Sequence, residues 1–205
     1  RRARLLERLP AGSIAFLFGK ASIGDNEKQD ADFFYLTGVE EEGAVVVFDK
    51  TERRTKAAKD ARGGDILFLK PRDPEAERWT GERDSAGEGT GQRIGFRYVL
   101  RTDSFAESLK DLALAAREIA HIGRIAPHDK PVPQEMKIAR ALALRIPGLT
   151  LSNHHTLIRD LRAVHTPYEI EQMRRAIAAT YEGFKAAFQT ARAGITEDAL
   201  KNSVE

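Results

Sequence analysis

The residues best suited to chemistry are five histidines, spread through a chain of 205 residues that contains no cysteine. Without cysteine the chain can form no disulfide, no thiolate metal site and no cysteine nucleophile. No two histidines have the i, i+4 spacing of a helical metal site, and no Asp or Glu stands at ligand spacing on a predicted rigid element. We therefore interpret His154 and His155 as surface histidines in a boundary loop, and His121, at a strand end, as a packed or hydrogen-bonded residue.

A second candidate is the glycine spacing at Gly87, Gly89 and Gly91, which resembles part of a phosphate-binding loop. Such a loop follows a buried strand, opens a helix and carries a further glycine, and these features are missing here. We interpret residues 81–91, rich in glycine and charge, as a surface loop. No serine has the surroundings of a nucleophile elbow. The residues alone show no complete catalytic set, so we expect no catalytic residue and no self-sufficient enzyme in this chain.

Composition narrows the possible partners. Thirty-three basic and 31 acidic residues give a net charge of only +2, which does not favour a nucleic-acid partner. No apolar run approaches the roughly 18 residues of a membrane span, so we expect no membrane partner. The lack of cysteine fits a cytoplasmic protein and equally permits an exported one. The chain does not begin with methionine and stops inside a predicted helix, so we expect it to be a piece of a longer protein.

The elements that must position any functional residue alternate between strand and helix. Apolar runs predict buried strands at residues 13–18, 44–48, 66–69 and 118–122, and alternation predicts a half-exposed strand at 93–99. Helices are predicted over 104–116, opened by a capping box of Ser104 and Glu107, and over 133–146. This order predicts an α/β domain with a mixed or mostly parallel sheet flanked by helices.

A domain boundary is predicted near residues 152–155, giving domains 1–153 and 154–205. In the second, Thr166, Pro167 and Glu169 form a strong helix start. An apolar stripe follows at helical spacing, formed by Ile170, Met173, Ile177, Tyr181, Phe184 and Phe188. Two helices of this length cannot close a core alone, so we expect them to belong to a domain completed elsewhere or to pack on a partner.

Three ordered segments resemble one known family, the Xaa-Pro aminopeptidases (aminopeptidase P). The segment 29–38 (QDADFFYLTG), followed by residues 40–48, is similar to the signature of the family's N-terminal domain. The segments 68–74 (FLKPRDP) and 77–83 (ERWTGER) are similar to its next block. The segment 161–176 (LRAVHTPYEIEQMRRA) is similar to the junction with the catalytic domain. Together the segments cover essentially the whole chain in the family's order.

The resemblance implies a fold and a reaction. It implies a ribonuclease-H-like N-terminal domain, like that of creatinase and prolidase, followed by the first helices of a truncated pita-bread domain. In the family, the pita-bread domain binds two divalent metal ions, usually manganese, through two Asp, one His and two Glu. Those ligands would lie beyond Glu205, so the resemblance implies no metal ligand and no cofactor in this chain. The reaction implied for the whole protein releases the N-terminal residue of peptides that have proline in second position.

The resemblance also implies roles for two residues. Trp79 matches a tryptophan that approaches the substrate pocket of a neighbouring subunit, and Asp25 matches an acidic residue that faces the free amine of the substrate. The N-terminal domain would thus gate the substrate, a proline-containing peptide, and help to form a homo-dimer or tetramer. Phe33, Phe34 and Tyr35 are expected in the core rather than at the substrate.

Two alternatives stay open at this point. Prolidase, which cuts Xaa-Pro dipeptides, shares the scaffold, and substrate length is decided partly by residues outside this chain. The same scaffold also resembles a histone-chaperone subunit that binds peptides without metals. The segment around Trp79 and the near-neutral charge argue mildly against this binding module.

Overall fold

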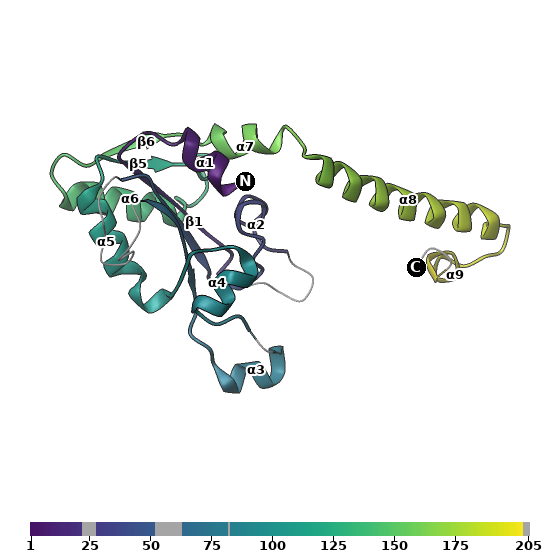
Figure 1. Ribbon diagram of the computed structural model, residues 1–205. Coiled ribbons are helices and arrows are strands. Elements are labelled where there is room, and N and C mark those ends of the chain that lie inside the picture. Colours follow the sequence, from purple (N-terminus) through teal and green to yellow (C-terminus); the bar gives the residue numbers. More distant parts are fainter. Residues whose placement is uncertain (22–27, 52–62, 82, 203–205) are drawn as a thin grey trace. The chain divides into compact units, whose positions relative to one another are not determined.

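One mixed sheet organises the larger part of the protein. The structure, a computed structural model, describes residues 1–21, 28–51, 63–81 and 83–202. Six strands are ordered β4-β3-β2-β1-β5-β6 (Figure 1). Strand β1 pairs antiparallel with β2, and β2 with β3, whereas the pairs β3–β4, β1–β5 and β5–β6 are parallel. The strands are β1 Ser13–Phe18, β2 Val45–Asp49, β3 Gly64–Leu69, β4 Tyr98–Arg101, β5 Glu118–His121 and β6 Thr150–Asn153. The predicted α/β class with a mixed sheet flanked by helices is confirmed.

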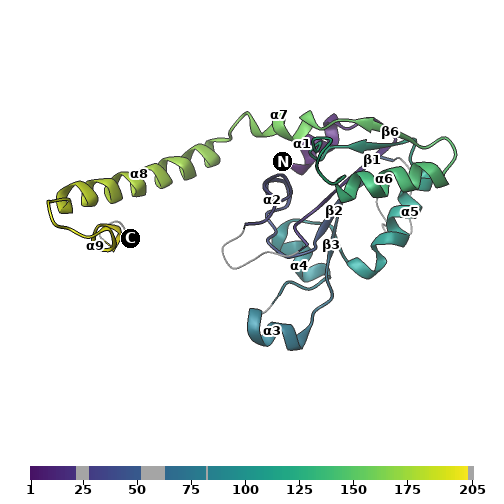
Figure 2. The same cartoon turned by 180° about the vertical axis from the view of Figure 1, so that it is seen from behind.

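The central strands are apolar on both faces, and this requires a helical layer on each side. In β1, Ala15 and Leu17 join one buried cluster, while Ile14 and Phe16 join the other. Helices α1, α2 and α7 cover the first face and α5 and α6 the second (Figures 1 and 2). The helices of this part are α1 Arg2–Arg8, α2 Ala31–Thr37, α3 Pro74–Thr80, α4 Glu88–Ile94, α5 Phe105–Ala115, α6 Gln134–Arg145 and α7 Thr156–Arg162, with a 3-10 turn η1 at Thr102–Ser104.

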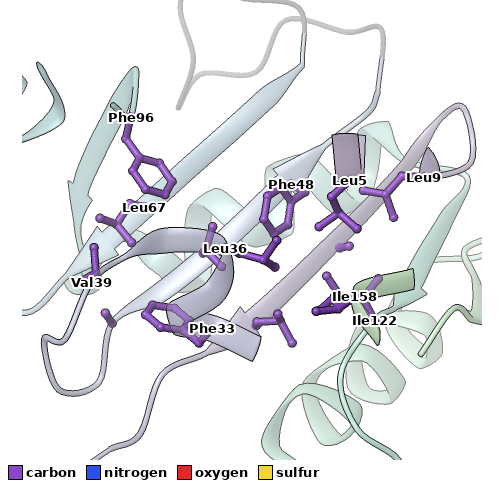
Figure 3. Close-up of a cluster of buried hydrophobic side chains, with 14 of the residues drawn as sticks. Leu5, Leu9, Phe33, Leu36, Val39, Phe48, Leu67, Phe96, Ile122 and Ile158 are labelled. Atoms are coloured by element: carbon purple, nitrogen blue, oxygen red, sulfur yellow. The ribbon is translucent and has the colours of Figure 1, made fainter. Parts of the chain in front are cut away.

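The first cluster draws side chains from widely separated segments. Figure 3 shows Leu5 of α1, Leu9 just after it, Phe33 and Leu36 of α2, and Ile158 of α7 converging on the same face of the sheet. All of these are buried. The two ends of this part of the chain are therefore held by one core.

The segment 81–99 differs from the prediction. Helix α4 occupies residues predicted as the end of a loop and the start of a strand, and β4 begins only at Tyr98. The alternation of Ile94, Phe96 and Tyr98 arises because the first ends a helix, the second lies in a turn and the third opens a strand. One of the three spaced glycines has a packing reason: a Cβ at Gly91 would lie 2.6 Å from the carbonyl oxygen of Phe96, so this position requires glycine.

The capping box predicted at the start of helix 104–116 is absent. Helix α5 is present, but Ser104 makes no cap, because its hydroxyl donates to the carbonyl of Arg101 at 2.8 Å from within η1. Strand β6 was not predicted as a strand. The chain divides into two compact units, Arg1–Arg162 and Ala163–Glu205, and α7 buries Ile158 and Leu161 in the core of the first. The domain boundary expected at 153/154 stays a prediction.

The second unit consists of α8 (Pro167–Thr190) and α9 (Glu197–Asn202) among its described residues. The predicted capping box is confirmed: the Glu169 amide donates to the Thr166 hydroxyl at 3.3 Å, and the Thr166 amide donates to the Glu169 carboxylate at 2.7 Å. No helix in the described ranges is long and apolar enough to cross a membrane.

Two neighbouring phenylalanines provide a test of this fold. Phe33 is fully buried and Phe34 is 41% exposed. We expect Phe33→Ala to lower the free energy of unfolding by about 3–5 kcal/mol, because it leaves a cavity in the first cluster. Phe34→Ala should cost about 1 kcal/mol or less. Urea denaturation followed by circular dichroism measures both, and equal losses would contradict the assignment of α2's buried face.

Candidate functional site

Trp79 is the most exposed large apolar residue that carries a predicted role. It lies on α3, is 90% exposed, and is the single tryptophan of the chain. Helix α3 projects from the end of the sheet in both views (Figures 1 and 2). A tryptophan has the largest apolar surface of any side chain, so leaving it in water is unfavourable unless another molecule covers it. This position suits contact with a ligand or a second protein rather than core packing.

Polar contacts rather than a core hold α3 in shape. The Asp73 carboxylate accepts from the Glu75 amide at 3.0 Å, which satisfies one of the free N–H groups at the helix start. The Arg72 guanidinium forms a forked hydrogen bond with the Glu77 carboxylate, with one contact of 3.0 Å and one of 2.5 Å. This bond lowers the pKa of Glu77. Trp79 therefore lies on a short helix that is stabilised by polar contacts rather than by buried side chains.

The segment after α3 is attached to the turn between α2 and β2. The Asp84 amide donates to the Glu41 carboxylate at 3.0 Å, and Arg83 lies 3.7 Å from the carboxylate of Glu42. The same turn is attached to Gln29, whose side-chain amide donates to the Glu41 carbonyl at 3.0 Å. The sequence identifies Gln29 and Glu41 only as positions within the motif segments, because no periodicity signals contacts across such separations.

Asp25, the second predicted site residue, lies outside the described residues, so its role stays a prediction. Phe33 belongs to the core as predicted, whereas the prediction was wrong for Phe34, which is 41% exposed because neighbouring residues of helix α2 face different directions. Tyr35 is partly buried, and its hydroxyl donates to the carbonyl of Leu161 at 3.0 Å. The Asp32 carboxylate on the same helix pairs with the guanidinium groups of Arg162 and Arg124. These contacts fasten α2 to the end of α7.

The histidines do not converge on a metal site. Within the described residues, no group of three or more His, Asp or Glu side chains could hold a metal ion. The His154 ring lies 3.7 Å from the Glu118 carboxylate, while the exposed His155 contacts the side chain of Asn153 at 2.9 Å. Their partners are ordinary surface groups.

His121 is buried at the end of β5, as predicted for a packed residue, with 4% of its surface exposed. Its Nε2 has no hydrogen-bond partner in the described part of the chain. Burial lowers the pKa of His121, an effect that a hydrogen bond with the Arg124 backbone and the charge of Glu135 only partly oppose, and His155 adds to the lowering. The ring is therefore held neutral in the fold.

Comparison with known proteins identifies the family to which this domain belongs. Residues 1–120 match the family model described as aminopeptidase P, N-terminal domain. The chain belongs to the aminopeptidase P N-terminal domain family. The resemblance inferred from the three motifs is confirmed.

The relatives of this aminopeptidase P domain are longer proteins. An Xaa-Pro aminopeptidase of Haemophilus influenzae is 26% identical over 210 residues, covering 100% of this chain and 45% of the relative. That of Escherichia coli K12 is 27% identical over 214 residues, covering 100% of this chain and 46% of the relative. The chain therefore spans somewhat under half the length of these curated relatives.

Solved structures agree on the fold. A candidate aminopeptidase P from Bacillus anthracis superposes with a TM-score of 0.81 at 24% identity, covering 99% of this chain and 48% of that one. The zinc-substituted aminopeptidase P of E. coli in complex with product gives a TM-score of 0.79 at 23% identity, covering 99% and 46%. At this identity the likeness supports the architecture of the aminopeptidase P domain.

The buried His121 gives a pH prediction for this domain. Because its pKa in the folded state lies below the ordinary value of 6.5, the unfolded chain binds more protons as the pH falls through that value. The contribution of His121 to stability should be fully present above about pH 6.5 and decrease below it. Urea denaturation measures this trend when it is repeated from about one pH unit above the ordinary histidine pKa to about one unit below it.

The control is His121→Phe, which fills a similar volume and cannot be protonated. Its free energy of unfolding should depend less steeply on pH than that of the unchanged chain. A chain and variant with the same pH dependence would contradict the neutral state assigned to His121.

Proposed function

We propose that this chain is the substrate-selecting and assembly part of a metal-dependent Xaa-Pro aminopeptidase. The observation that carries the proposal is Trp79, which is 90% exposed and lies within residues 1–120, the part of the chain that matches the family model. The proposed whole protein releases the N-terminal residue from peptides with proline in second position. Both relatives, from H. influenzae and E. coli, are Xaa-Pro aminopeptidases.

The described residues do not fit a metal centre, since no three potential ligands gather among them. No step of peptide-bond cleavage is therefore assigned to this chain. We place the divalent metals, proposed to be manganese, and the residues that hold them in the part of the protein that corresponds to the remaining length of the relatives. The zinc-substituted E. coli structure supports metal dependence in that relative.

The chain's own contribution is a binding surface for the substrate. The indole ring of Trp79 offers a flat apolar face that packs well against a proline ring or an extended peptide. Since α3 projects from its own domain, we propose that this face serves the active site of a neighbouring subunit in a homo-dimer or tetramer. An exposed indole that is covered only on assembly would restrict entry to short chain ends.

The second unit supports the proposal of a longer protein. Its helix α8 carries the predicted apolar stripe, and these side chains are exposed within the unit, from 40% for Met173 to 80% for Phe188. Contiguous apolar surfaces of this kind are uncommon on isolated soluble domains and mark surfaces that something else covers. We propose that the remainder of the catalytic domain packs on this stripe.

The first test compares hydrolysis of an Xaa-Pro-Pro peptide in added manganese by this chain and by the longest native form that contains it. We expect activity only in the longer form. No hydrolysis by either, with no bound metal, would overturn the peptidase proposal and favour a peptide-binding module. Cleavage confined to Xaa-Pro dipeptides would favour prolidase instead.

The role of Trp79 is tested in the longer form by Trp79→Ala. We expect kcat/KM for the tripeptide to fall by about tenfold or more, equivalent to about 1.4 kcal/mol, because the substrate loses an aromatic contact. Thermal stability should change little, since 90% of the side chain is exposed. The matched control is Leu144→Ala, which removes an 88% exposed apolar side chain on α6. Undiminished activity in Trp79→Ala, or a strictly monomeric active enzyme by sedimentation, would remove the proposed role across subunits.

A further inference from the structure

Helix α3 has no core of its own, so something else must fix where Trp79 points. It has seven residues, from Pro74 to Thr80, and a helix this short is not stable in water by itself. Trp79 is 90% exposed and cannot anchor the segment. The contacts that locate α3 must therefore lie in the chain on either side of it.

On its C-terminal side the attachment is a backbone amide bound to a carboxylate. The Asp84 amide donates to Glu41 Oε1 at 3.0 Å, and a hydrogen bond to an ionised acceptor is stronger than one between neutral groups. Asp84 also pairs through its side chain with Arg93 of α4. Asp84, which follows α3 in the chain, is thus held through both its backbone amide and its side chain.

Glu41 is itself fixed from the sheet. The Gln29 side chain, 8% exposed, donates to the Glu41 carbonyl at 3.0 Å and accepts from the amides of Lys20 and Asp30 at 2.5 and 2.8 Å. Gly19, at the end of β1, allows this approach, because a Cβ there would lie 2.8 Å from Gln29 Nε2. A continuous set of hydrogen bonds therefore runs from the end of β1, through Gln29 and Glu41, to Asp84.

We propose that Glu41 is a positioning residue for Trp79: its carboxylate holds Asp84, and its Gln29-bound backbone fixes that point relative to the sheet. This inference rests on the proposed function in one respect, that Trp79 contacts substrate. In the positioning role Glu41 touches no substrate. It restricts the directions in which the indole can point, and so lowers the entropy lost when substrate binds.

The structural test uses the single tryptophan as its own reporter. We expect Glu41→Ala to lower the time-resolved fluorescence anisotropy of Trp79 in this chain and to raise the exchange rate of the Asp84 amide by at least about tenfold. Glu41→Gln should change both readouts much less than Glu41→Ala, because its amide oxygen still accepts from Asp84, although through a weaker, neutral hydrogen bond. Glu40→Ala, which removes the neighbouring exposed acid, is the matched control and should change neither readout.

Two outcomes would overturn the proposal. One is an unchanged anisotropy and exchange rate in Glu41→Ala. The other, which needs no variant and holds even if Glu41→Ala fails to fold, is an Asp84 amide in the unchanged chain that exchanges as fast as an unprotected peptide.

Hydrolysis by the longer form separates this inference from the proposed function. With an Xaa-Pro-Pro peptide we expect Glu41→Ala to raise KM by about tenfold with little change in kcat, and Glu41→Gln to restore KM. If the longer form hydrolyses no peptide but the anisotropy and exchange changes occur, positioning stands and the peptidase proposal fails. If the longer form is active and Glu41→Ala leaves both KM and anisotropy unchanged, the positioning proposal fails and the peptidase proposal stands.

Discussion

The fold depends on a sheet whose central strands are apolar on both faces. Strand β1 sends Ala15 and Leu17 to one cluster and Ile14 and Phe16 to the other, and it pairs antiparallel with β2 and parallel with β5. Each face must be covered, so α1, α2 and α7 form one layer and α5 and α6 form the other. Once both layers are in place, the ends of the strands are the positions from which functional segments can emerge.

Apolar runs in the sequence were sufficient to predict this frame, because burial imposes period and composition directly on strands and helices. Strands β1, β2, β3 and β5 follow from such runs. The start of α8 follows from the reciprocal hydrogen bonds of Thr166 and Glu169, with Pro167 at the first helical position. The errors have equally local causes. Residues 93–99 alternate by coincidence across a helix end, a turn and a strand, and β6 carries Thr, Ser and Asn at a sheet edge, where burial imposes little pattern.

The candidate site was predictable only in part. Trp79 was named from a motif resemblance; the structure shows that its side chain is exposed, and its role stays a prediction. Asp25, named in the same way, lies outside the described residues. The contacts of Gln29 and Glu41 were not predicted, because a hydrogen bond between residues 41 and 84 depends on two turns meeting in space. Such contacts leave no periodic trace in the sequence.

A surface that selects peptides has to satisfy two opposing requirements. Its apolar groups must stay exposed until the ligand arrives, so they cannot stabilise their own segment by packing. They must also be held in a narrow range of orientations, because disorder in the free state weakens binding. Polar anchors resolve this conflict in α3, where Arg72 and Glu77 brace the helix and Glu41 holds Asp84. With these anchors in place, the indole stays exposed yet keeps a narrow range of directions, so that less entropy is lost when the proposed substrate covers it.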